Sequence, residues 1–509
     1  MGKKQTISES ASGDKYYVTT SIAYVNGSPH IGYASELLQA DVLARWNRLL
    51  GNDTFYLTGT DENTLKLVKA AKNEGTEPRN LADKYAEQFK RLTTALNLSN
   101  DYFIRTTDER RHHPGAQKVW EALVANGYIY KGTYEGMYCV DCEQFYTDKE
   151  TADGKCPVHG ITLEHQSEKN YLFKLSAFTG QLKELITSGA YQVDPEERRH
   201  EILALFERGL QDVSFSRPSD KLSMGVPVPG DPSQTMYVWC DALTNYITGV
   251  GYPSDMKTFR HYWPADVHII GKDIIRFHAA YWPAMLLGAG LPLPKRLYVH
   301  GFFTIEGEKM SKSKGNVIDP FELCERHGVD PVRYCLLASM PYAGDGNYAE
   351  QRFQELYDSH LANDLGNLVS RVLAMVESGY GGTVNAGTAD PSLMEHVAQA
   401  HHGLKQLLDD CRFADALETL NNLVSAANRY IEEKQPWNQE GQANRDTLYS
   451  LVQVLGHLSH LYEPFIPATA EKLRRKLGTS LPGNWQEMMD FEIKPDTKIT
   501  KGEPLFPKT

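Results

Sequence analysis

The start of the chain alternates strand-like and helix-like segments, and this alternation restricts the possible folds more than any other feature. Residues 16–22 (YYVTTSI) have the apolar, β-branched composition of a buried strand, 26–29 (NGSP) form a turn, and 31–50 carry apolar side chains at helical spacing. A second strand at 54–57 precedes a helical stretch at 64–73. This pattern predicts an α/β fold around a parallel sheet, with ligands beyond the carboxyl ends of the strands.

Two polar residues follow these strands and are expected to share a crevice. His30 precedes the first helix, and Asp61 follows the second strand. A helix N-terminus offers free N–H groups and a positive dipole end to a phosphate, and Gly32 allows a nucleotide to approach the backbone closely. A single histidine at such a place is more often a helix cap or a packed side chain, so His30 alone does not establish a phosphate site.

The pattern changes near residue 127 and again after residue 348. Short segments rich in Tyr, Gly and Cys predict a β-rich insertion, after which strands at 267–270 and 297–299 extend the parallel sheet and amphipathic helices close the chain. The sequence therefore predicts a disordered tail at 1–14, two halves of a catalytic nucleotide-binding domain at 15–126 and 236–300, a connective insertion at 127–235, a segment at 301–348 and a helical bundle at 349–509.

Composition excludes several classes of protein. The formal charge of the 509-residue chain is −12, which argues against indiscriminate coating of nucleic acid, and no DNA partner is expected. The apolar run at 279–294 is broken by three prolines and too short to span a bilayer, and the N-terminus lacks an apolar signal stretch, so no membrane partner is expected. Seven scattered cysteines form no disulfide pattern, which favours a reducing, cytoplasmic location.

Four residues of the insertion have the spacing of a metal site. Cys139 and Cys142 form a C-x2-C pair, and Cys156 and His159 form a C-x2-H pair further along. Three thiolates and one imidazole can surround Zn²⁺ tetrahedrally and leave no position open for water. The alternative is four unrelated residues, but two such pairs in a Gly-containing segment favour a metal. We therefore expect one structural zinc ion per chain.

A lysine-rich segment forms the second dense motif. Lys309, Lys312 and Lys314 alternate with small residues just before Gly315. In a surface loop, lysine ammonium groups can contact phosphate oxygens and stabilise the charge that builds on a leaving pyrophosphate. On composition alone, a solvated basic loop or a non-specific RNA contact is the more common explanation.

Several segments together resemble one enzyme family. The segments 30–33 (HIGY) and 309–313 (KMSKS) resemble the paired signatures of class I aminoacyl-tRNA synthetases. Within that class, 237–246 (YVWCDALTNY), 271–278 (GKDIIRFH), 501–507 (KGEPLFP) and the four metal ligands resemble the methionyl-tRNA synthetases over nearly the whole chain. The resemblance implies a Rossmann-like catalytic domain split by a zinc-bearing insertion, a stem-contact segment with the lysine loop, and an anticodon-binding bundle.

Related class I enzymes fit this chain less well. Those for isoleucine, valine and leucine carry an added editing domain and are much longer. The cysteine enzyme binds its substrate thiol through zinc, which requires an open coordination position that a four-ligand knuckle lacks.

The resemblance also implies a reaction and its residues. ATP, with Mg²⁺, would activate L-methionine to methionyl adenylate, and the methionyl group would pass to the 3′ end of tRNA(Met), including the initiator. No protein nucleophile is needed, so catalysis rests on positioning and charge stabilisation. The implied catalytic residues are His30, Tyr33, Lys309 and Lys312. The implied ATP site comprises His30, Gly32, Gly271, Asp273, His300, Gly301, Lys309 and Lys312. The implied methionine site comprises Ile22, Tyr24, Asp61, Trp239, Ala242, Tyr246, Ile274 and His278, with Asp61 on the α-ammonium group.

Two positions depart from the family pattern. Tyr33 stands where histidine is common; its hydroxyl can donate a hydrogen bond, but it cannot carry a positive charge. After Asp61 the family often has glutamate, histidine and glycine, whereas this chain has Glu62, Asn63 and Thr64. The resemblance therefore implies a role for Asp61 and for no other residue of that run.

The helical part offers candidate residues for reading RNA bases. Asn363, Asn367 and Arg371 are spaced to share one helix face, and asparagine is a poor residue for a helix interior without another purpose. Trp437 resembles the tryptophan on which the family stacks an anticodon base. The alternative is a solvated polar stripe beside a packed tryptophan.

Two other functions stay open on the sequence alone. A different nucleotidyl transferase could use the same His and Lys signatures, but it would have no use for a long helical domain. A synthetase-like protein that only binds tRNA would show damaged ATP signatures, and only Tyr33 departs from them. The chain lacks the appended dimerising domain of some relatives, so a monomer is expected.

Overall fold

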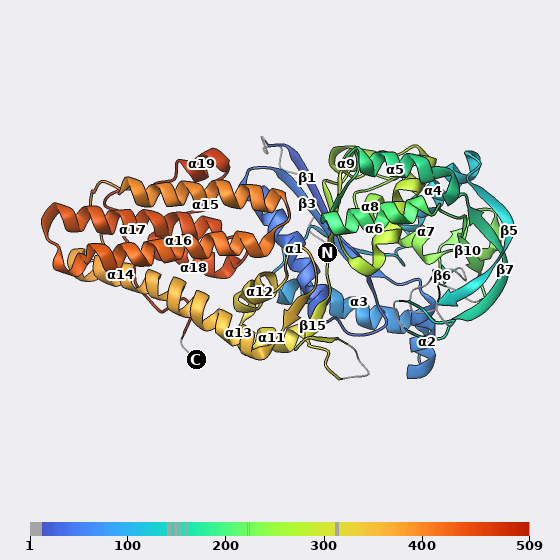
Figure 1. Cartoon of the computed structure of the whole chain (residues 1–509), viewed down its shortest axis with the longest axis horizontal. Helices are drawn as coiled ribbons and strands as arrows, with labels where there is room; N and C mark the ends of the chain where they lie inside the picture. Colours follow the sequence, from blue (N-terminus) through green and yellow to red (C-terminus); the bar gives the residue numbers. More distant parts are fainter. Residues whose placement is uncertain are drawn as a thin grey trace.

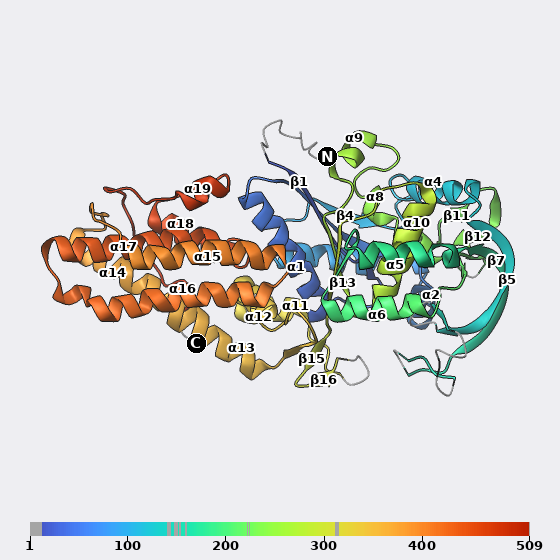
Figure 2. The ribbon, with the colours of Figure 1, turned by 45° about the horizontal axis from the view of Figure 1, so that its top comes forward.

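The chain folds into an elongated molecule with a parallel sheet at its centre, a helical bundle at one end and a long antiparallel hairpin at the other (Figure 1). Turning the molecule keeps the bundle and the hairpin at opposite ends (Figure 2). The computed structural model describes residues 13–139, 144–146, 151, 154–157, 160–220, 222, 224–310 and 315–507.

The central sheet is parallel throughout. Its strands run in the order β2-β3-β1-β13-β14-β8, with β4 also paired to β3. Their bounds are β1 Lys15–Thr20, β2 Ala23–Tyr24, β3 Asp53–Asp61, β4 Tyr102–Arg105, β8 Gln192–Asp194, β13 Val267–Gly271 and β14 Arg296–His300. Together with the helical bundle described below, this sheet confirms the predicted α/β fold.

Two cores form on opposite faces of the sheet because strand side chains alternate in direction. Tyr17 of β1 packs into one core and Val18 into the other. The helices of this part of the chain are α1 Ile31–Leu49, α2 Leu65–Glu74, α3 Pro78–Ala95, α4 His113–Ala125, α5 Thr179–Thr187, α6 Glu196–Glu207, α7 Val238–Ala242, α8 Asn245–Thr248, α9 Met256–Tyr262 and α10 Trp282–Ala289. Helix α1 is buried over most of its length, on the face shared with the bundle.

The segment predicted as a β-rich insertion contains more than strands. Its antiparallel part comprises β5 Ile129–Cys139, β6 Gln144–Tyr146, β7 Glu164–Phe173, β9 Val213–Ser214, β10 Ser216–Pro218, β11 Pro227–Val228 and β12 Asp231–Met236. Helices α5 and α6 lie between them, and β8 pairs in parallel with β14 and so extends the central sheet. The boundaries of the insertion itself stay a prediction.

The C-terminal part is helical, as predicted. A small sheet comprises β15 Phe303–Ile305, β16 Glu308–Lys309 and β17 Gly346–Tyr348. Between β16 and β17 in the sequence lie the helices α11 Pro320–His327 and α12 Val329–Ala338. The bundle follows, with α13 Glu350–Leu356, a π-helical stretch Tyr357–Gly366, α14 Asn367–Tyr380, α15 Pro391–Asp409, α16 Phe413–Lys434, α17 Gly441–Leu461, α18 Pro467–Leu477 and α19 Trp485–Met489. In the part of the chain that the structure describes, no helix is long and apolar enough to cross a membrane.

One predicted loop is in fact strand. The sequence placed residues 58–61 after the second strand, but β3 continues to Asp61 because β4 and β2 both pair with its second half. Gly59 makes this possible, since a Cβ there would lie 2.1 Å from the carbonyl oxygen of Ile104 on β4.

Three histidines are buried between helices of the bundle. His401 of α15 and His457 of α17 are joined by a 3.0 Å contact between Nε2 and Nδ1. His460 packs edge-on against Phe491, with ring centres 4.2 Å apart. Burial lowers the pKa of His401 and His460 to about 3 and that of His457 to about 4. The neighbouring His402 lowers the pKa of His401 further, and Arg474 lowers that of His460. The three rings are therefore neutral in the folded protein at pH 7.

The bundle should lose stability in mild acid. The unfolded chain binds protons on these histidines near pH 6.5 and the folded chain only near pH 3 to 4, so stability is complete above pH 6.5 and falls as pH is lowered through that window. Each histidine should contribute a loss of about 1 to 2 kcal/mol between pH 7 and pH 5. Melting temperatures of the His460→Leu variant should differ less between these pH values than those of the unmodified chain. The exposed His396→Leu serves as control; equal pH dependence in all three proteins would contradict the assignment.

Candidate active site

Two adjoining cavities open at the carboxyl ends of the central strands. The smaller has a volume of about 170 Å³ and the larger about 630 Å³. Both are lined by Ala23, Tyr24, Glu36, Gly271 and Asp273. A ligand with two chemically different halves could therefore occupy both cavities at once.

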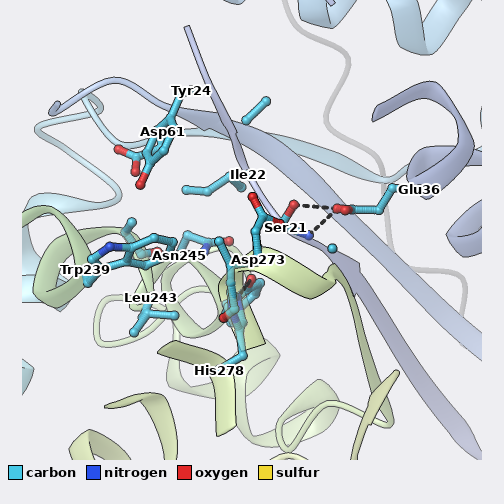
Figure 3. A pocket seen from close by; sticks show the side chains of 15 residues that line it. Ser21, Ile22, Tyr24, Glu36, Asp61, Trp239, Leu243, Asn245, Asp273 and His278 are labelled. Atoms are coloured by element: carbon cyan, nitrogen blue, oxygen red, sulfur yellow. Dashed lines mark hydrogen bonds between the residues drawn. The ribbon is translucent and has the colours of Figure 1, made fainter. Parts of the chain in front are cut away.

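Every residue predicted to bind methionine lines the smaller cavity: Ile22, Tyr24, Asp61, Trp239, Ala242, Tyr246, Ile274 and His278. Asp61 and Tyr24 lie on one side, and Trp239, Leu243 and His278 lie on another (Figure 3). The Trp239 ring is held in a stack on Phe277 with ring centres 3.8 Å apart. An apolar aromatic pocket with one buried carboxylate fits a ligand that has an apolar side chain and an ammonium group.

The polar contacts of His278 fix its state. Its Nδ1 lies 3.0 Å from the carbonyl oxygen of Ile274, so Nδ1 donates, and Nε2 accepts from the Tyr246 hydroxyl at 2.7 Å. Burial lowers the pKa of His278 to about 4, so the ring is neutral at pH 7. Both nitrogens are occupied, and the ring can offer the cavity only its carbon edge.

A buried hydrogen-bonded chain that the sequence did not reveal lies behind this pocket. Asp241 of α7 bridges His112 Nε2 and Asn63 Nδ2, each at 2.5 Å, and His112 Nδ1 lies 2.9 Å from the Thr248 hydroxyl. These contacts hold α7, which carries Trp239, against the end of β3. They also give Asn63, one of the departures from the family pattern, a role in packing.

The next residue has a separate local role. Thr64 caps α2 by accepting a hydrogen bond from the Leu67 N–H at 3.1 Å. A glycine at position 64 could not provide this cap.

Glu36 is the most prominent residue that sequence reasoning missed. It is 4% exposed on α1, and one carboxylate oxygen accepts from both the N–H and the hydroxyl of Ser21 at 2.8 and 2.5 Å. The other oxygen lies 2.9 Å from His300 Nε2. Burial alone would lower the pKa of His300, but the hydrogen bond and charge of Glu36 raise it above its ordinary value. In the sequence, Glu36 could have been noticed as an acidic residue within the apolar stripe of the helix.

The larger cavity brings the two signature motifs together. His30 caps α1 and its Nδ1 accepts from the Gly32 N–H at 3.2 Å. A Cβ at Gly32 would lie 3.1 Å from the His30 ring and 3.5 Å from Cε of Met310, so the lysine loop faces the start of α1. Lys309 lines the same cavity, and Lys312 lies outside the described residues.

The remaining residues predicted to bind ATP line the larger cavity as well: Gly271, Asp273, His300 and Gly301. A Cβ at Gly301 would lie 1.8 Å from the carbonyl oxygen of Gly344, so no side chain fits there. Lys66 was not predicted and also lines this cavity, 4.9 Å from the centre of the Tyr24 ring. Glycine backbone, a helix N-terminus and lysine ammonium groups are suited to phosphates.

Tyr33 directs its hydroxyl inward. The oxygen lies 3.1 Å from the Thr58 hydroxyl and donates to the carbonyl oxygen of Gly59 at 3.2 Å. Its ring packs edge-on against Phe89. Burial raises the pKa of Tyr33 well above its ordinary value, so the group is a neutral phenol that ties α1 to β3.

Two of the four predicted metal ligands can be described. Cys139, at the end of β5, and Cys156 are both buried in one small apolar cluster with Tyr146 and Leu163. Cys142 and His159 lie outside the described residues, and the rest of the described chain holds no group of three or more His, Cys, Asp or Glu side chains that could hold a metal. Two neighbouring buried thiols are suited to a soft ligand set such as that of Zn²⁺.

The predicted anticodon residues lie on the bundle surface. Trp437 is 54% exposed, and the Arg371 guanidinium lies 5.9 Å from the centre of its ring. Arg371 also bonds to Glu432 at 2.7 Å. Asn363 is exposed and Asn367 half-buried; the π-helical stretch before Asn367 shifts the regular spacing on which their common face was predicted.

Comparison with known proteins places the chain in a family. A family model described as "tRNA synthetases class I (M)" matches residues 16–166 and 150–373, and one described as "Anticodon-binding domain of tRNA ligase" matches 390–501. A methionine–tRNA ligase of Brucella suis is 44% identical over 98% of this chain and 98% of its own. One of Caldanaerobacter subterraneus is 40% identical over 97% of this chain and 78% of its own.

A solved structure of Mycobacterium tuberculosis methionyl-tRNA synthetase in complex with methionyl-adenylate matches with a TM-score of 0.93 at 39% identity, covering 97% of this chain and all of that one. The chain belongs to the class I methionyl-tRNA synthetase family. Membership confirms the resemblance drawn from the two signature motifs and excludes an unrelated nucleotidyl transferase. The roles of individual residues in this family member stay predictions.

Tyr33→Phe should separate positioning from catalysis. Loss of the hydroxyl removes two hydrogen bonds to β3, so stability should fall by about 1 kcal/mol. Tyr33 lines the larger cavity, but its hydroxyl is already hydrogen-bonded to Thr58 and Gly59. The rate of methionine-dependent ATP–pyrophosphate exchange should therefore change less than about threefold. A hundredfold loss of exchange in a variant with nearly unchanged melting temperature would show that the hydroxyl acts in the reaction.

Proposed function

We propose that this chain is a methionine–tRNA ligase that activates L-methionine with ATP and transfers it to tRNA(Met), including the initiator. The observation that carries the proposal is the pair of adjoining cavities, one aromatic with a buried carboxylate and the other lined by glycines, His30 and Lys309. The names of the relatives and the adenylate in the related structure support it.

In this proposal the methionine carboxylate attacks the α-phosphorus of ATP. A bond forms between carboxylate oxygen and phosphorus, the bond to the bridging oxygen breaks, and pyrophosphate leaves with Mg²⁺. His30, Lys309 and Lys312 stabilise the charge that develops on the phosphates, while Asp61 holds the α-ammonium group. A terminal ribose hydroxyl of tRNA then attacks the activated carbonyl, and AMP leaves.

ATP–pyrophosphate exchange with each of the common amino acids tests the proposal. Exchange that depends on methionine supports it. Exchange with another amino acid, or none at all from folded protein, would overturn it. The second outcome would favour a family member that only binds tRNA.

Lys309→Ala should reduce the activation rate far more than methionine binding. Lys309 lines the larger cavity, and its positive charge should mainly stabilise the charge that develops as pyrophosphate separates. The kcat for exchange should therefore fall about a hundredfold with little change in the methionine KM. Lys405→Ala, which changes a half-buried lysine on the bundle that pairs with Asp409, should leave both constants unchanged. A change confined to the methionine KM would refute this role for Lys309.

We further propose that Cys139, Cys142, Cys156 and His159 hold one structural zinc ion. The supporting observation is the shared burial of Cys139 and Cys156. The ion would add no step to the reaction; it would join the two halves of the knuckle and so stabilise the insertion.

Cys139→Ser should therefore lower zinc content and melting temperature together. Cys324→Ser, a half-buried cysteine on α11, should retain both. Elemental analysis and thermal melting on the same preparations decide the matter. A Cys139→Ser protein that has lost zinc but keeps full stability and full exchange would contradict a structural role.

The exposed ring of Trp437 and the adjacent Arg371 support the proposal that this surface binds the anticodon. Trp437→Ala removes a stacking surface worth about 1 to 3 kcal/mol per base, so charging of tRNA should fall roughly ten- to a hundredfold while exchange stays near normal. Trp437→Phe keeps an aromatic surface and should retain much of the activity. Parallel loss of exchange and charging would show that the ring only packs the bundle.

We also propose that the enzyme works as a cytoplasmic monomer. Support for this location comes from the cysteines, which form no disulfide pattern in the sequence and so favour a reducing compartment. Light scattering should give a mass near 57.3 kDa, and a mass near twice that value at micromolar concentration would refute the monomer.

A further inference from the structure

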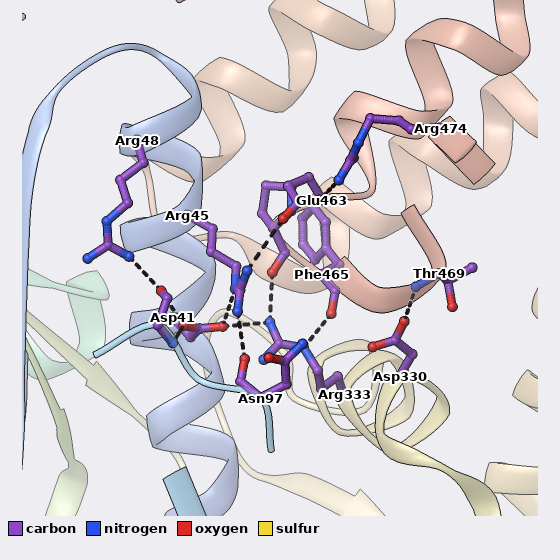
Figure 4. A network of polar contacts seen from close by, with 12 residues as sticks. Asp41, Arg45, Arg48, Asn97, Asp330, Arg333, Glu463, Phe465, Thr469 and Arg474 are labelled. Atoms are coloured by element: carbon purple, nitrogen blue, oxygen red, sulfur yellow. Dashed lines mark hydrogen bonds and ion pairs between the residues drawn. The ribbon is translucent and has the colours of Figure 1, made fainter. Parts of the chain in front are cut away.

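A buried polar network joins the catalytic part of the chain to the bundle. Its centre is the ion pair between Asp41 of α1 and Arg333 of α12, whose side chains are both fully buried with a 2.7 Å contact (Figure 4). The network lies away from both cavities, since none of its members lines either of them.

The Arg333 guanidinium bonds to four residues in three separate parts of the chain. Besides Asp41, its Nε donates to the carbonyl oxygen of Phe465 at 2.8 Å, and its two terminal nitrogens donate to the carbonyl oxygens of Leu96 and Pro464 at 3.0 and 2.9 Å. Pro464 and Phe465 form the turn between α17 and α18 of the bundle. A planar fork with four of its five N–H donors engaged restricts the relative positions of its acceptors.

Asp41 is saturated in the same way. One of its oxygens accepts from the N–H and hydroxyl of Ser99 at 2.6 and 2.7 Å, and the other meets Arg45 and Arg333 at 2.8 and 2.7 Å. Burial alone would raise the pKa of Asp41, but the two guanidinium groups lower it below its ordinary value, so the carboxylate is charged.

Further contacts continue this junction into the bundle. Glu463 lies between Arg45 of α1 at 3.4 Å and Arg474 of α18 at 2.6 Å. Asp330 of α12 accepts from the Thr469 N–H near the start of α18 at 2.5 Å. Helices α1, α12 and α18 therefore meet through charged groups as well as through apolar packing.

The connection leads directly to the candidate active site. Helix α1 begins just after His30, and Asp41 lies about three turns, roughly 16 Å, further along the same helix. Helix α12 follows the lysine loop in sequence. The network thus joins the helix that carries one signature motif, a helix downstream of the other, and the turn of the bundle.

Buried ion pairs contribute less to stability than apolar residues of similar size often would, because both charges lose their hydration. What this pair supplies is geometry: its hydrogen bonds fit only one arrangement of α1, α12 and the bundle turn. An apolar contact would permit sliding of the bundle by an ångström or more, which is enough to misplace a reacting group.

We propose that Asp41, Arg333 and Arg45 are positioning residues for the transfer step: they fix the tRNA-binding bundle relative to α1 so that the acceptor end of a bound tRNA reaches the adenylate. This inference rests on the proposed function. The network does not position methionine or ATP, and it therefore acts on transfer and not on activation.

The test compares three variants, with substitutions on α1 or α12, in amino-acid activation and in tRNA charging. Arg333→Met breaks the centre of the network, and Arg45→Met, at a half-buried position, is the milder change if Arg333→Met folds poorly. Arg48→Met is the control on the same helix, because Arg48 bonds to Ser99 and Asp101 in the catalytic part and not to Arg333 or Glu463. The N–H and hydroxyl of Ser99 can still bond to Asp41 in this variant. Exchange, charging of full-length tRNA(Met) and charging of an acceptor-stem minihelix are measured per folded molecule.

For Arg333→Met and Arg45→Met we expect at least a tenfold loss of kcat for charging full-length tRNA, with tRNA KM, exchange and minihelix charging within about twofold of normal. Arg48→Met should change none of these ratios. Equal losses in exchange and charging, equal losses for tRNA and minihelix, or a lower melting temperature without any selective loss would each overturn the inference. If the unmodified chain shows no methionine-dependent exchange, the proposed function has failed instead.

Discussion

Parallel pairing between β1 and β13 is the contact on which both cavities depend. Val18 pairs with Val267, and Thr20 with Ile269, across the whole insertion. This register places the ends of the two strands side by side, so that Tyr24 and Asp61 from the first half of the chain meet Gly271, Asp273 and Ile274 from the second. Parallel strands always bring their carboxyl ends to the same edge, and this rule explains why the ligand cavities lie there.

Helix α1 is the second element that the arrangement requires. Its N-terminus meets the larger cavity, Glu36 in its second turn holds the ends of β1 and β14, and Asp41 near its middle meets Arg333 beside the bundle turn. The two buried carboxylates are tolerated within this helix because both oxygens of each are hydrogen-bonded or ion-paired. Helix α1 therefore contacts the larger cavity, the ends of β1 and β14, and the junction with the bundle.

The sequence predicted the local patterns well and the long-range ones poorly. Helix and strand positions near the N-terminus and the lining of both cavities follow from periodicity, turn residues and the family resemblance. His30 and Asp61 were expected to share one crevice, but His30 lines the larger cavity and Asp61 the smaller one beside it. The extension of β3 to Asp61 and the pairing of β8 with β14 depend on contacts between distant segments, which no local pattern records. Asp241 and Arg333 were missed for the same reason, because each resembles an ordinary helix residue until its distant partners are known. Glu36 stood out only as an acidic residue within an apolar stripe, and its partners Ser21 and His300 could not be predicted from that.

One bound molecule is expected to span both cavities. A crystal structure of the chain grown with L-methionine and a non-hydrolysable ATP analogue, or with a stable analogue of methionyl adenylate, tests it most directly. The thioether should lie among Trp239, Tyr246 and His278, the α-ammonium group at Asp61, and the phosphate or its replacement beside His30. Density for the ligand outside these cavities, or with its amino-acid end in the larger one, would contradict it.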